Sequence, residues 1–455
     1  MSIIGTFMVP HPPLIIPEVG KGSEHQVDKT ISSYQEVAKE IAKFNPETII
    51  ISSPHANYYS DYFYISGSKV VNGNFSSFGA SNVSFTEEID CELAKEIERI
   101  AKKEKFPCGC IEDEILDHGT MVPLYFIRKQ LPKCKLIVVG LSTLPLLDNY
   151  HFGMIINQAI NKLNRRVVFV ASGDLSHKLQ EYGPYGFVKE GPIYDEKIMK
   201  TMSSGNFNEL LEYEEVFLDK AAECGHRSFT IMAGTLDGVD VKSKQLSHED
   251  VTGVGYGICT FYPQDNNKER EFYQKYIDKI IENNKSKDEY VNLAKKTIET
   301  YIKDKIKIKV PTSISNELLN KKAGVFVSIH KLGKLRGCIG TFLPTTNSIA
   351  EEIINNAISA STKDPRFSAI TEDELKYLKI NVDVLSKPES IKSKEELDPK
   401  KYGVIVTNGF RKGLLLPDLE GIDTVDEQIA IAKNKAGIMK NEDITLERFE
   451  VVRHE

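Results

Sequence analysis

Two histidines that each follow a short apolar run are the residues of this chain best suited to bind a metal ion together. The run 3–9 leads into Pro10-His11-Pro12-Pro13, and the run 49–53 leads through Pro54 into His55. Apolar, β-branched runs that end at proline are typical of buried strands entering loops. Ligands of open α/β sheets bind just beyond the carboxyl ends of such strands, so two imidazoles there predict a shared metal site. The alternative for each histidine is a hydrogen-bonded loop residue.

Three further segments supply groups of the same kind. A third apolar run, 167–171, opens into Ser172-Gly173-Asp174-Leu175-Ser176-His177, and Asp117-His118-Gly119 brings another histidine beside an Asp. Glu223-Cys224-Gly225 adds a carboxylate and a thiol. Iron sites that activate dioxygen commonly use two histidines and one anionic ligand, which leaves positions open for substrate and oxygen. A further histidine can then act as general base, and an Asp can orient an imidazole.

Taken together, residues 1 to about 263 resemble the class III extradiol ring-cleaving dioxygenases, and most closely their Memo-like branch. The matching segments are Pro10-His11-Pro12-Pro13, Ser53-Pro54-His55, Asp117-His118-Gly119 with Val122-Pro123-Leu124, Gly173-Asp174-Leu175-Ser176-His177 and Glu223-Cys224-Gly225. The resemblance implies that His11 and His55 bind the metal. It also implies that His177 is the general base, with Asp174 beside it. His118 matches a histidine that contacts the substrate or supports the ligands.

The third metal ligand is where this chain departs from the ring-cleaving enzymes. The dioxygenases use Glu there and the Memo-like branch carries Cys, and Cys224-Gly225 matches that Cys-Gly pair. Glu223 is adjacent and stays an alternative. A thiolate is softer than a carboxylate, suits copper or zinc as well as iron, and is open to oxidation beside activated dioxygen. The resemblance therefore predicts a metal pocket, with Fe(II) as the first expectation and Zn or Cu as alternatives.

Composition excludes several other classes of protein. The 455 residues suggest two or three domains, and 58 basic against 65 acidic side chains (net −7) offer no general attraction to nucleic acid. Seven cysteines in so long a chain do not form a disulfide framework, which predicts a reducing cytoplasm. No uncharged apolar run reaches the length of a membrane span, so we expect no membrane insertion.

The second half of the chain carries a different set of motifs. Residues 264–286 are highly charged, with apolar residues at helical spacing that predict a connecting helix. Beyond them, residues 287–455 resemble the AMMECR-type domain. The matching segments are Leu335-Arg336-Gly337-Cys338-Ile339-Gly340-Thr341-Phe342, Asp364-Pro365-Arg366-Phe367, Lys412-Gly413-Leu414-Leu415-Leu416-Pro417 and Lys435-Ala436-Gly437. That family has no settled reaction to carry over.

Cys338 is the candidate functional residue of this second half. Arg336, two positions away, would lower the pKa of the Cys338 thiol and make it reactive. Arg366 and Lys412 would join Arg336 in an anion-binding cleft if the fold brings them together. The alternative is that Cys338 is a small buried residue in a strand, where free cysteines usually lie.

We therefore expect an α/β domain (1–263) with helical stretches such as 27–44 and 87–102, a charged helical linker (264–286) and a smaller α+β domain (287–455). This fusion resembles the single-chain form of the AmmeMemoRadiSam system, which implies a radical SAM protein as partner. Two functions stay open. One is an Fe(II)-dependent, dioxygenase-like oxidoreductase acting on a small aromatic or phenolic substrate. The other is a metal-binding accessory or adaptor protein without turnover.

Overall fold

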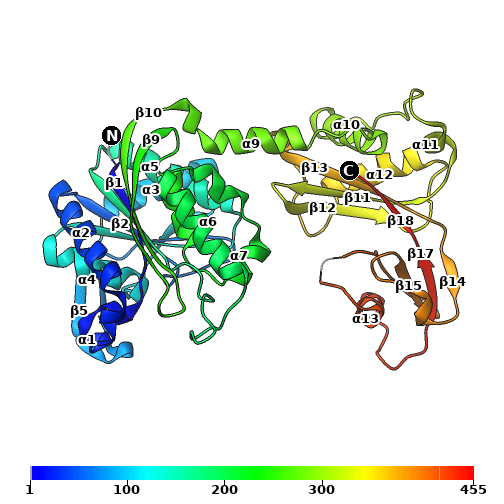
Figure 1. The fold of residues 1–455 in the computed structure, drawn as a ribbon. Coiled ribbons are helices and arrows are strands. Elements are labelled where there is room, and N and C mark those ends of the chain that lie inside the picture. The colour runs from blue at the N-terminus through cyan, green and yellow to red at the C-terminus, as the bar shows by residue number, and fades with distance from the viewer. Residues whose placement is uncertain (1–2, 420) are drawn as a thin grey trace. The chain divides into compact units, whose positions relative to one another are not determined.

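The computed structural model describes residues 3–419 and 421–455, and it divides the chain into two compact units, Met1–Tyr276 and Ile277–Glu455 (Figure 1). The boundary falls inside α9 (Phe272–Asn283), the helix predicted for the charged segment. The first part of that segment belongs to a strand, because β10 continues to Asn266.

The first unit is built on one mixed sheet of eight strands in the order β6-β3-β7-β2-β8-β1-β10-β9. Its four central strands, β7, β2, β8 and β1, are parallel, whereas β10 runs antiparallel to β1. The central strands are almost wholly buried, which explains their continuous apolar runs. The strands are β1 (Ile3–Val9), β2 (Thr48–Ser53), β3 (Phe63–Ser66), β6 (Cys108–Ile111), β7 (Lys135–Gly140), β8 (Val167–Ser172), β9 (Val239–Glu249) and β10 (Tyr256–Asn266).

Helices cover both faces of this sheet (Figure 1). The helices α2 and α4 pack on one face, and α5 and α8 contact the strands from the other. In α2 the buried side chains Tyr34, Val37, Ala38 and Ile41 recur at helical spacing and form its apolar stripe. The helices of this unit are α1 (Pro17–Gly20), α2 (Asp28–Phe44), α3 (Cys91–Glu104), α4 (His118–Gln130), α5 (Leu146–Leu163), α6 (Glu190–Ser204), α7 (Glu215–Ala221) and α8 (His226–Gly234).

One predicted helix boundary was wrong. The stretch 87–102 was expected to be helical throughout, but Glu87 and Glu88 end β5 (Ala80–Glu88), which pairs with β4 (Val70–Phe75) in a separate hairpin. The helix begins only at Cys91, because the Asp90 side chain accepts a hydrogen bond from the backbone N–H of Leu93 and caps it. In the sequence, the acidic residues before this cap resemble the first turn of a helix, which explains why the predicted boundary was too early.

The second unit confirms the expected α+β class, with two antiparallel four-stranded sheets in the orders β12-β11-β13-β18 and β14-β17-β15-β16. Helices α10 and α12 pack on the first sheet around one apolar core, and α13 packs on the second around a smaller core. The elements are α10 (Glu289–Asp304), α11 (Asn316–Asn320), β11 (Gly324–Lys331), β12 (Lys334–Thr341), α12 (Ile349–Thr362), β13 (Leu378–Leu385), β14 (Glu389–Ile391), β15 (Gly403–Asn408), β16 (Arg411–Leu415), α13 (Val425–Lys435), β17 (Thr445–Phe449) and β18 (Val451–His454).

A glycine of the Leu-Arg-Gly-Cys-Ile-Gly motif has a packing role in this unit. A Cβ atom at Gly337 would lie 2.2 Å from the carbonyl oxygen of Ala360, so β12 approaches the backbone of α12 too closely for any side chain there. Among the described residues of the whole chain, no helix is both long and apolar enough to cross a membrane.

Candidate metal centre

The carboxyl ends of three neighbouring parallel strands bring the predicted residues together. β1 ends two residues before His11, β2 two residues before His55, and β8 two residues before Asp174. Helix α4 begins at His118, with Asp117 as its cap. The Ser53 hydroxyl donates to the Asp117 carboxylate at 2.6 Å, which ties the end of β2 to the start of α4. Side chains from four separate segments therefore meet at one edge of the sheet.

His11 is buried, and its hydrogen bonds determine which ring nitrogen faces the site. Its Nδ1 lies 3.0 Å from the Ser172 hydroxyl, and that hydroxyl already donates its proton to the carbonyl of Gly119. The Ser172 oxygen must therefore accept a hydrogen bond from the Nδ1–H group of His11. In this tautomer Nε2 carries the free lone pair, which is the form that a metal ligand needs.

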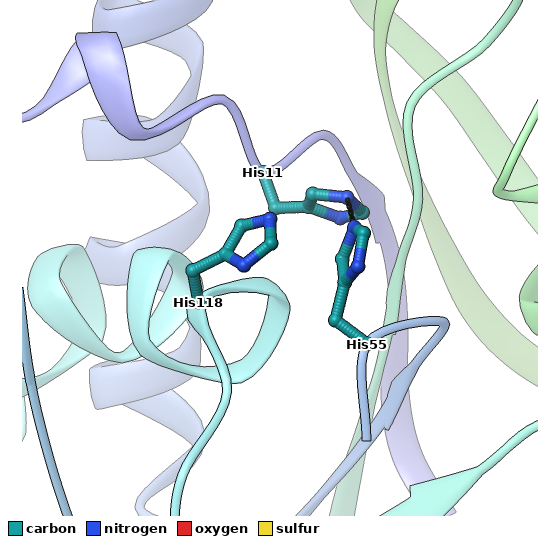
Figure 2. A group of neighbouring side chains, drawn as sticks. All are labelled: His11, His55 and His118. Atoms are coloured by element: carbon teal, nitrogen blue, oxygen red, sulfur yellow. Dashed lines mark hydrogen bonds between the residues drawn. The ribbon is translucent and has the colours of Figure 1, made fainter. Parts of the chain in front are cut away.

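His55 and His118 face the same point as His11 (Figure 2). The Nε2 atoms of His11 and His55 lie 3.1 Å apart, and the rings of His55 and His118 have their centroids 4.0 Å apart. One ligand atom from each of the three imidazoles lies within 4.8 Å of the others, which is close enough to share one ion. The sequence predicted that His118 contacts the substrate or supports the ligands, and the structure also places one of its ring nitrogens where it could itself bind the ion.

Cys224 and Asp174 form a second group that shares His11. The Cys224 sulfur lies 3.7 Å from Nε2 of His11 and accepts a hydrogen bond from the backbone N–H of Asp174. The two loops meet because glycines face each other, and a Cβ at Gly173 would lie 2.1 Å from the Cα of Gly225. Asp174 was expected beside His177, but its carboxylate accepts a hydrogen bond from the backbone N–H of His11.

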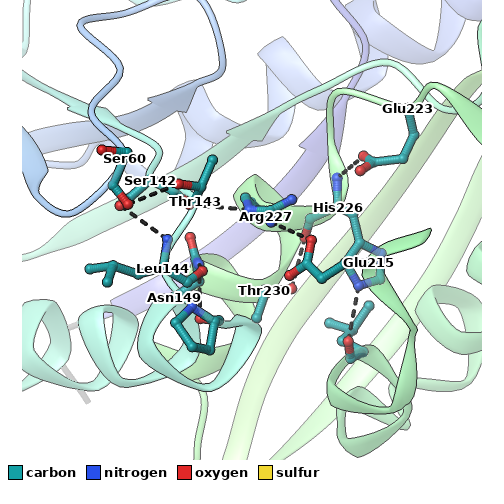
Figure 3. A network of polar contacts seen from close by, with 12 residues as sticks. Ser60, Ser142, Thr143, Leu144, Asn149, Glu215, Glu223, His226, Arg227 and Thr230 are labelled. Atoms are coloured by element: carbon teal, nitrogen blue, oxygen red, sulfur yellow. Dashed lines mark hydrogen bonds and ion pairs between the residues drawn. The ribbon is translucent and has the colours of Figure 1, made fainter. Parts of the chain in front are cut away.

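Glu223 belongs to neither group and has other partners (Figure 3). Its carboxylate accepts a hydrogen bond from the backbone N–H of His226 at the start of α8. Next to it, Arg227 pairs with Glu215 and donates to the carbonyl of Ser142, so this network holds α8 against the loop after β7. Cys224 therefore lies in a group with His11, whereas the Glu223 carboxylate is occupied at the start of α8.

His177 completes the set of histidines. Its ring stacks on that of Tyr185, with the centroids 5.2 Å apart, and its Nε2 is buried without a hydrogen-bond partner among the described residues. Buried polar atoms of native proteins are rarely left unpaired, so this nitrogen is available to a ligand. Sequence reasoning missed Tyr185 and Ser172. Tyr185 lies in a loop with no pattern, whereas Ser172 stands at a strand end, a position that could have marked it.

The histidines of the cluster all favour their neutral forms. Burial, and to a lesser extent the nearby His55, lowers the pKa values of His118 and of His177 to about 4. Burial and the neighbouring imidazoles hold the pKa of His11 well below its usual range. Burial also raises the pKa of Asp174 to about 7, and burial with the nearby carboxylates raises that of the Cys224 thiol. Neutral imidazoles are the form that binds metal, whereas the thiol must lose its proton to do so.

The donors fit a transition metal. Imidazole nitrogens and a thiol suit iron, zinc and copper, and the orphaned Nε2 of His177 adds a basic group that is not needed as a ligand. On the His118 side, the site borders a cavity of about 500 Å³ whose wall includes Phe78 and Met121. The Phe78 ring meets the His118 ring edge-on at 5.4 Å, which gives this cavity an aromatic wall.

In the second unit, the candidate residues near Cys338 are already paired. Arg336 donates to the Glu374 carboxylate, Arg366 pairs with Asp364, and Lys412 pairs with Glu447. The backbone of Cys338 donates to Asp364 and accepts from Arg366, and its sulfur accepts from the Ser328 hydroxyl. The three cations of the predicted anion cleft are therefore each neutralised by a carboxylate.

The first unit is thus a mixed α/β fold with three histidines beyond its parallel strands, placed closely enough to share one metal ion. Residues 5–259 match the catalytic LigB subunit of aromatic ring-opening dioxygenase, and residues 291–454 match AMMECR1. Because the first match spans more than half of the chain, the protein belongs to the LigB family, with an AMMECR1 domain following.

Proteins similar to all or part of this chain occur in bacteria and archaea. A protein of Clostridium acetobutylicum is 42% identical over 466 residues, which is 100% of this chain and 99% of the relative. A protein of Thermotoga maritima is 52% identical over 167 residues, covering 36% of this chain and 96% of its own length. A crystal structure of an uncharacterized Pyrococcus horikoshii protein is 32% identical over 36% of this chain and 88% of its own, with a TM-score of 0.34.

Proposed function

We propose that the first unit is a metal-dependent oxidoreductase of the ring-opening dioxygenase type, acting on a small aromatic or phenolic substrate. The metal would be Fe(II), with Zn or Cu as alternatives, held by His11, His55 and Cys224. The observation that carries this proposal is the tautomer of His11, whose Nε2 lone pair faces the His55 ring and the Cys224 sulfur. Such a nitrogen is set up to bind a cation.

The other residues of the cluster have separate roles in this proposal. A bound Fe(II) would supply Lewis acidity toward substrate hydroxyls and the electron chemistry that dioxygen requires. His177 would take a proton from a substrate hydroxyl at its unpartnered Nε2, and stacking on Tyr185 orients its ring. His118, beside the aromatic wall formed by Phe78, would hydrogen-bond the substrate oxygens.

Two alternatives for the third ligand remain in the proposal. Glu223 is one residue before Cys224, the position at which the dioxygenases carry their Glu ligand. Its carboxylate, however, accepts a hydrogen bond at the start of α8. Asp174 offers a carboxylate oxygen in the same group as His11 and Cys224. Cys224 is preferred because its sulfur directly faces Nε2 of His11.

The thiol also favours a second function. A buried sulfur donor beside activated dioxygen is exposed to oxidation, whereas it is well suited to a metal that is bound without turnover. In that case the chain would be a metal-binding accessory or adaptor protein that assists a radical SAM partner. The two functions differ at His177, which an enzyme needs and an adaptor does not.

The metal content of protein purified without oxygen, measured by elemental mass spectrometry beside His11→Ala, tests the proposal. We expect near-stoichiometric iron that is lost in the variant, and oxygen uptake when catechols are added. Zinc or copper in place of iron, without oxygen uptake, would support the adaptor. Equal metal content in the two proteins would contradict both functions.

A further inference from the structure

The residue that precedes the proposed base His177 is held from three sides. Ser176 is fully buried, and its backbone carbonyl accepts a hydrogen bond from the N–H of Gly255, directly before β10, at 2.8 Å. Its hydroxyl donates to the carbonyl of Ala221 at the end of α7, at 2.8 Å. Its backbone N–H donates to the carboxylate of Asp195 on α6, at 2.9 Å. Because His177 is the next residue, these three bonds determine where its side chain begins.

Asp195 is the charged member of this set of partners. It is only 3% exposed, and its second carboxylate oxygen lies 2.8 Å from Nε2 of His248 on β9, a residue whose side chain is partly exposed. An ionised carboxylate only accepts hydrogen bonds, so Nε2 of His248 donates to it. Burial raises the pKa of the Asp195 carboxyl, whereas the hydrogen bonds from His248 and from the backbone of Ser176 oppose that rise. Two donors therefore stabilise the charge that burial disfavours.

The local backbone is shaped to admit this buried carboxylate. A Cβ atom at Gly255 would lie 2.0 Å from Oδ2 of Asp195, so any side chain at that position would displace the carboxylate. The carbonyl of Gly255 also accepts a hydrogen bond from the N–H of Leu175. A buried charge is costly unless it is paired and hydrogen-bonded. What it supplies here, and an apolar side chain would not, is a strong and directional acceptor for the N–H of Ser176.

We infer that Asp195, oriented by His248, is a positioning residue that holds the His177 imidazole in place through Ser176. Nε2 of His177 has no hydrogen-bond partner among the described residues to fix the ring, which therefore depends on its stacking with Tyr185 and on its backbone. A general base must lie within hydrogen-bond reach of the proton that it takes, and a displacement of about 1 Å can cost about 100-fold in rate. This inference rests on the proposed function and names residues that place its base.

Steady-state oxygen uptake by the iron-loaded full chain with catechol is the first test. Asp195→Ala removes the acceptor, and we expect it to lower kcat about 10- to 100-fold while KM and iron content stay within about twofold, because substrate and metal bind elsewhere. Asp195→Asn keeps an oxygen that can accept from Ser176, so its kcat should stay within about threefold of that of the unchanged protein. Glu196→Ala removes the neighbouring exposed carboxylate of α6 and should change nothing.

Hydrogen exchange of the metal-free full chain, followed by mass spectrometry, gives a second readout that needs no turnover. In Asp195→Ala, the peptide that covers residues 174–180 should exchange about tenfold faster or more, and the other peptides of the first unit should be unchanged.

His248 provides a matched pair of milder variants at a partly exposed position. His248→Gln carries an N–H donor to about the place of Nε2 and should match the unchanged protein in kcat and in hydrogen exchange. His248→Asn is too short to reach Asp195 and should show a weaker form of both defects.

The outcomes separate this inference from the function on which it rests. An unchanged kcat in Asp195→Ala would overturn the positioning role and leave the proposed function standing. A fall in kcat with an equal loss of iron, or with faster exchange throughout the first unit, would make Asp195 merely structural and would also overturn it. If the unchanged protein consumes no oxygen with catechol, the proposed function fails and the inference fails with it.

If Asp195→Ala does not fold, the two His248 variants decide. A defect in His248→Asn that is absent from His248→Gln supports the positioning role, and equal behaviour of the two overturns it.

Discussion

At the edge of the first unit's sheet, His11, His55 and His118 face one another, and His177 lies in a loop beyond the same edge. Among the described residues none of these four rings forms an ion pair with a carboxylate. Around Cys338 in the second unit, every candidate cation has a carboxylate partner, and the backbone of Cys338 is itself hydrogen-bonded. Both regions contain motifs that attracted a functional interpretation from the sequence.

The two regions contain different kinds of polar group. Those of the first include a group that is unpaired among the described residues and can bind a ligand, whereas those of the second are paired and stabilise the fold. Buried polar atoms without partners destabilise a protein unless something binds them, and the Nε2 of His177 is of this kind among the described residues. Arg336 is already satisfied by Glu374 and by the carbonyl of Ser368. We therefore expect changes in the first region to alter chemistry and changes in the second to alter stability.

The largest effect is expected from His177→Ala. Loss of a general base should lower catechol-dependent oxygen uptake about 10²–10⁴-fold while iron content stays near that of the unchanged protein. Steady-state oxygen consumption, with metal analysis of the same samples, measures both quantities. Arg336→Met, in the other region, is the control and should leave uptake unchanged. Unaltered turnover in His177→Ala would remove this histidine from the chemistry.

Cys224→Ser and Glu223→Gln form a matched pair that tests the third ligand. Removing the thiol that faces His11 should weaken metal affinity roughly 100-fold, since a thiolate is a much stronger ligand than a hydroxyl. Glu223→Gln should change it by about threefold or less, because that carboxylate instead accepts a hydrogen bond from the backbone N–H of His226 at the start of α8. Competition with a chromophoric chelator gives both affinities. The reverse order would make Glu223 the ligand.

In the second unit, Arg336→Met should reduce the free energy of unfolding by about 2 kcal/mol, because it leaves the largely buried Glu374 carboxylate with Lys331 as its remaining cation. Lys412→Met breaks a more exposed pair with Glu447 and should cost about 1 kcal/mol or less. Hydrogen exchange of amides in the second unit reports both. If both variants kept their stability but lost phosphate binding, the anion-binding cleft predicted from the sequence would be supported instead.

Acidification should also distinguish the units. Burial lowers the pKa of His226 to about 3 in the folded unit, whereas its pKa in the unfolded chain is about 6.5. Below about pH 6.5 the unfolded chain therefore binds a proton at His226 and the folded unit does not. Folded-state stability of the metal-free first unit therefore falls as the pH drops from about 6.5 toward 4. His118 and His177 act in the same direction. Asp174 and Glu223, with pKa values of about 7, bind protons when folded and offset part of this loss.

In the second unit, the comparable buried group is a carboxyl, which is charged and paired in the folded state at neutral pH. Hydrogen bonds from Arg336 and the backbone of Thr371 outweigh burial and lower the pKa of Glu374 to about 2, so its contribution is lost only below the unfolded value of about 4.5. Hydrogen exchange at pH 7 and pH 5 should show destabilisation of the first unit alone. His226→Gln should reduce that change by about 2 kcal/mol. Equal changes in both units would contradict this account.

Much of the fold was predictable because local patterns carry it. The central strands are buried on both faces, so their apolar runs were continuous and their ends at prolines or glycines were clear. The helix α2 and the connecting helix α9 showed apolar side chains at helical spacing. The start of α3 was misplaced because Glu87 and Glu88 pair in a hairpin, a long-range contact that local composition does not reveal.

The candidate site was predictable as a set of residues but not as an arrangement. Residues that follow parallel strands share an edge of the sheet, which is why His11, His55 and Asp174 could be grouped before their distances were known. The sequence left open whether Cys224 or Glu223 faces that edge. Adjacent residues in a loop point in different directions, and only the contact between Gly173 and Gly225 brings the Cys224 sulfur to His11.

The sequence by itself determined the two domain classes, the strands, and the residue types that gather beyond them, because these depend on hydrophobic periodicity and short motifs. Only the tertiary structure decided which groups are paired. It joined Arg336 to Glu374 across the second unit, oriented His11 through Ser172, and left Nε2 of His177 buried without a partner among the described residues. Such pairings join residues far apart in the chain, and their geometry depends on how whole elements pack.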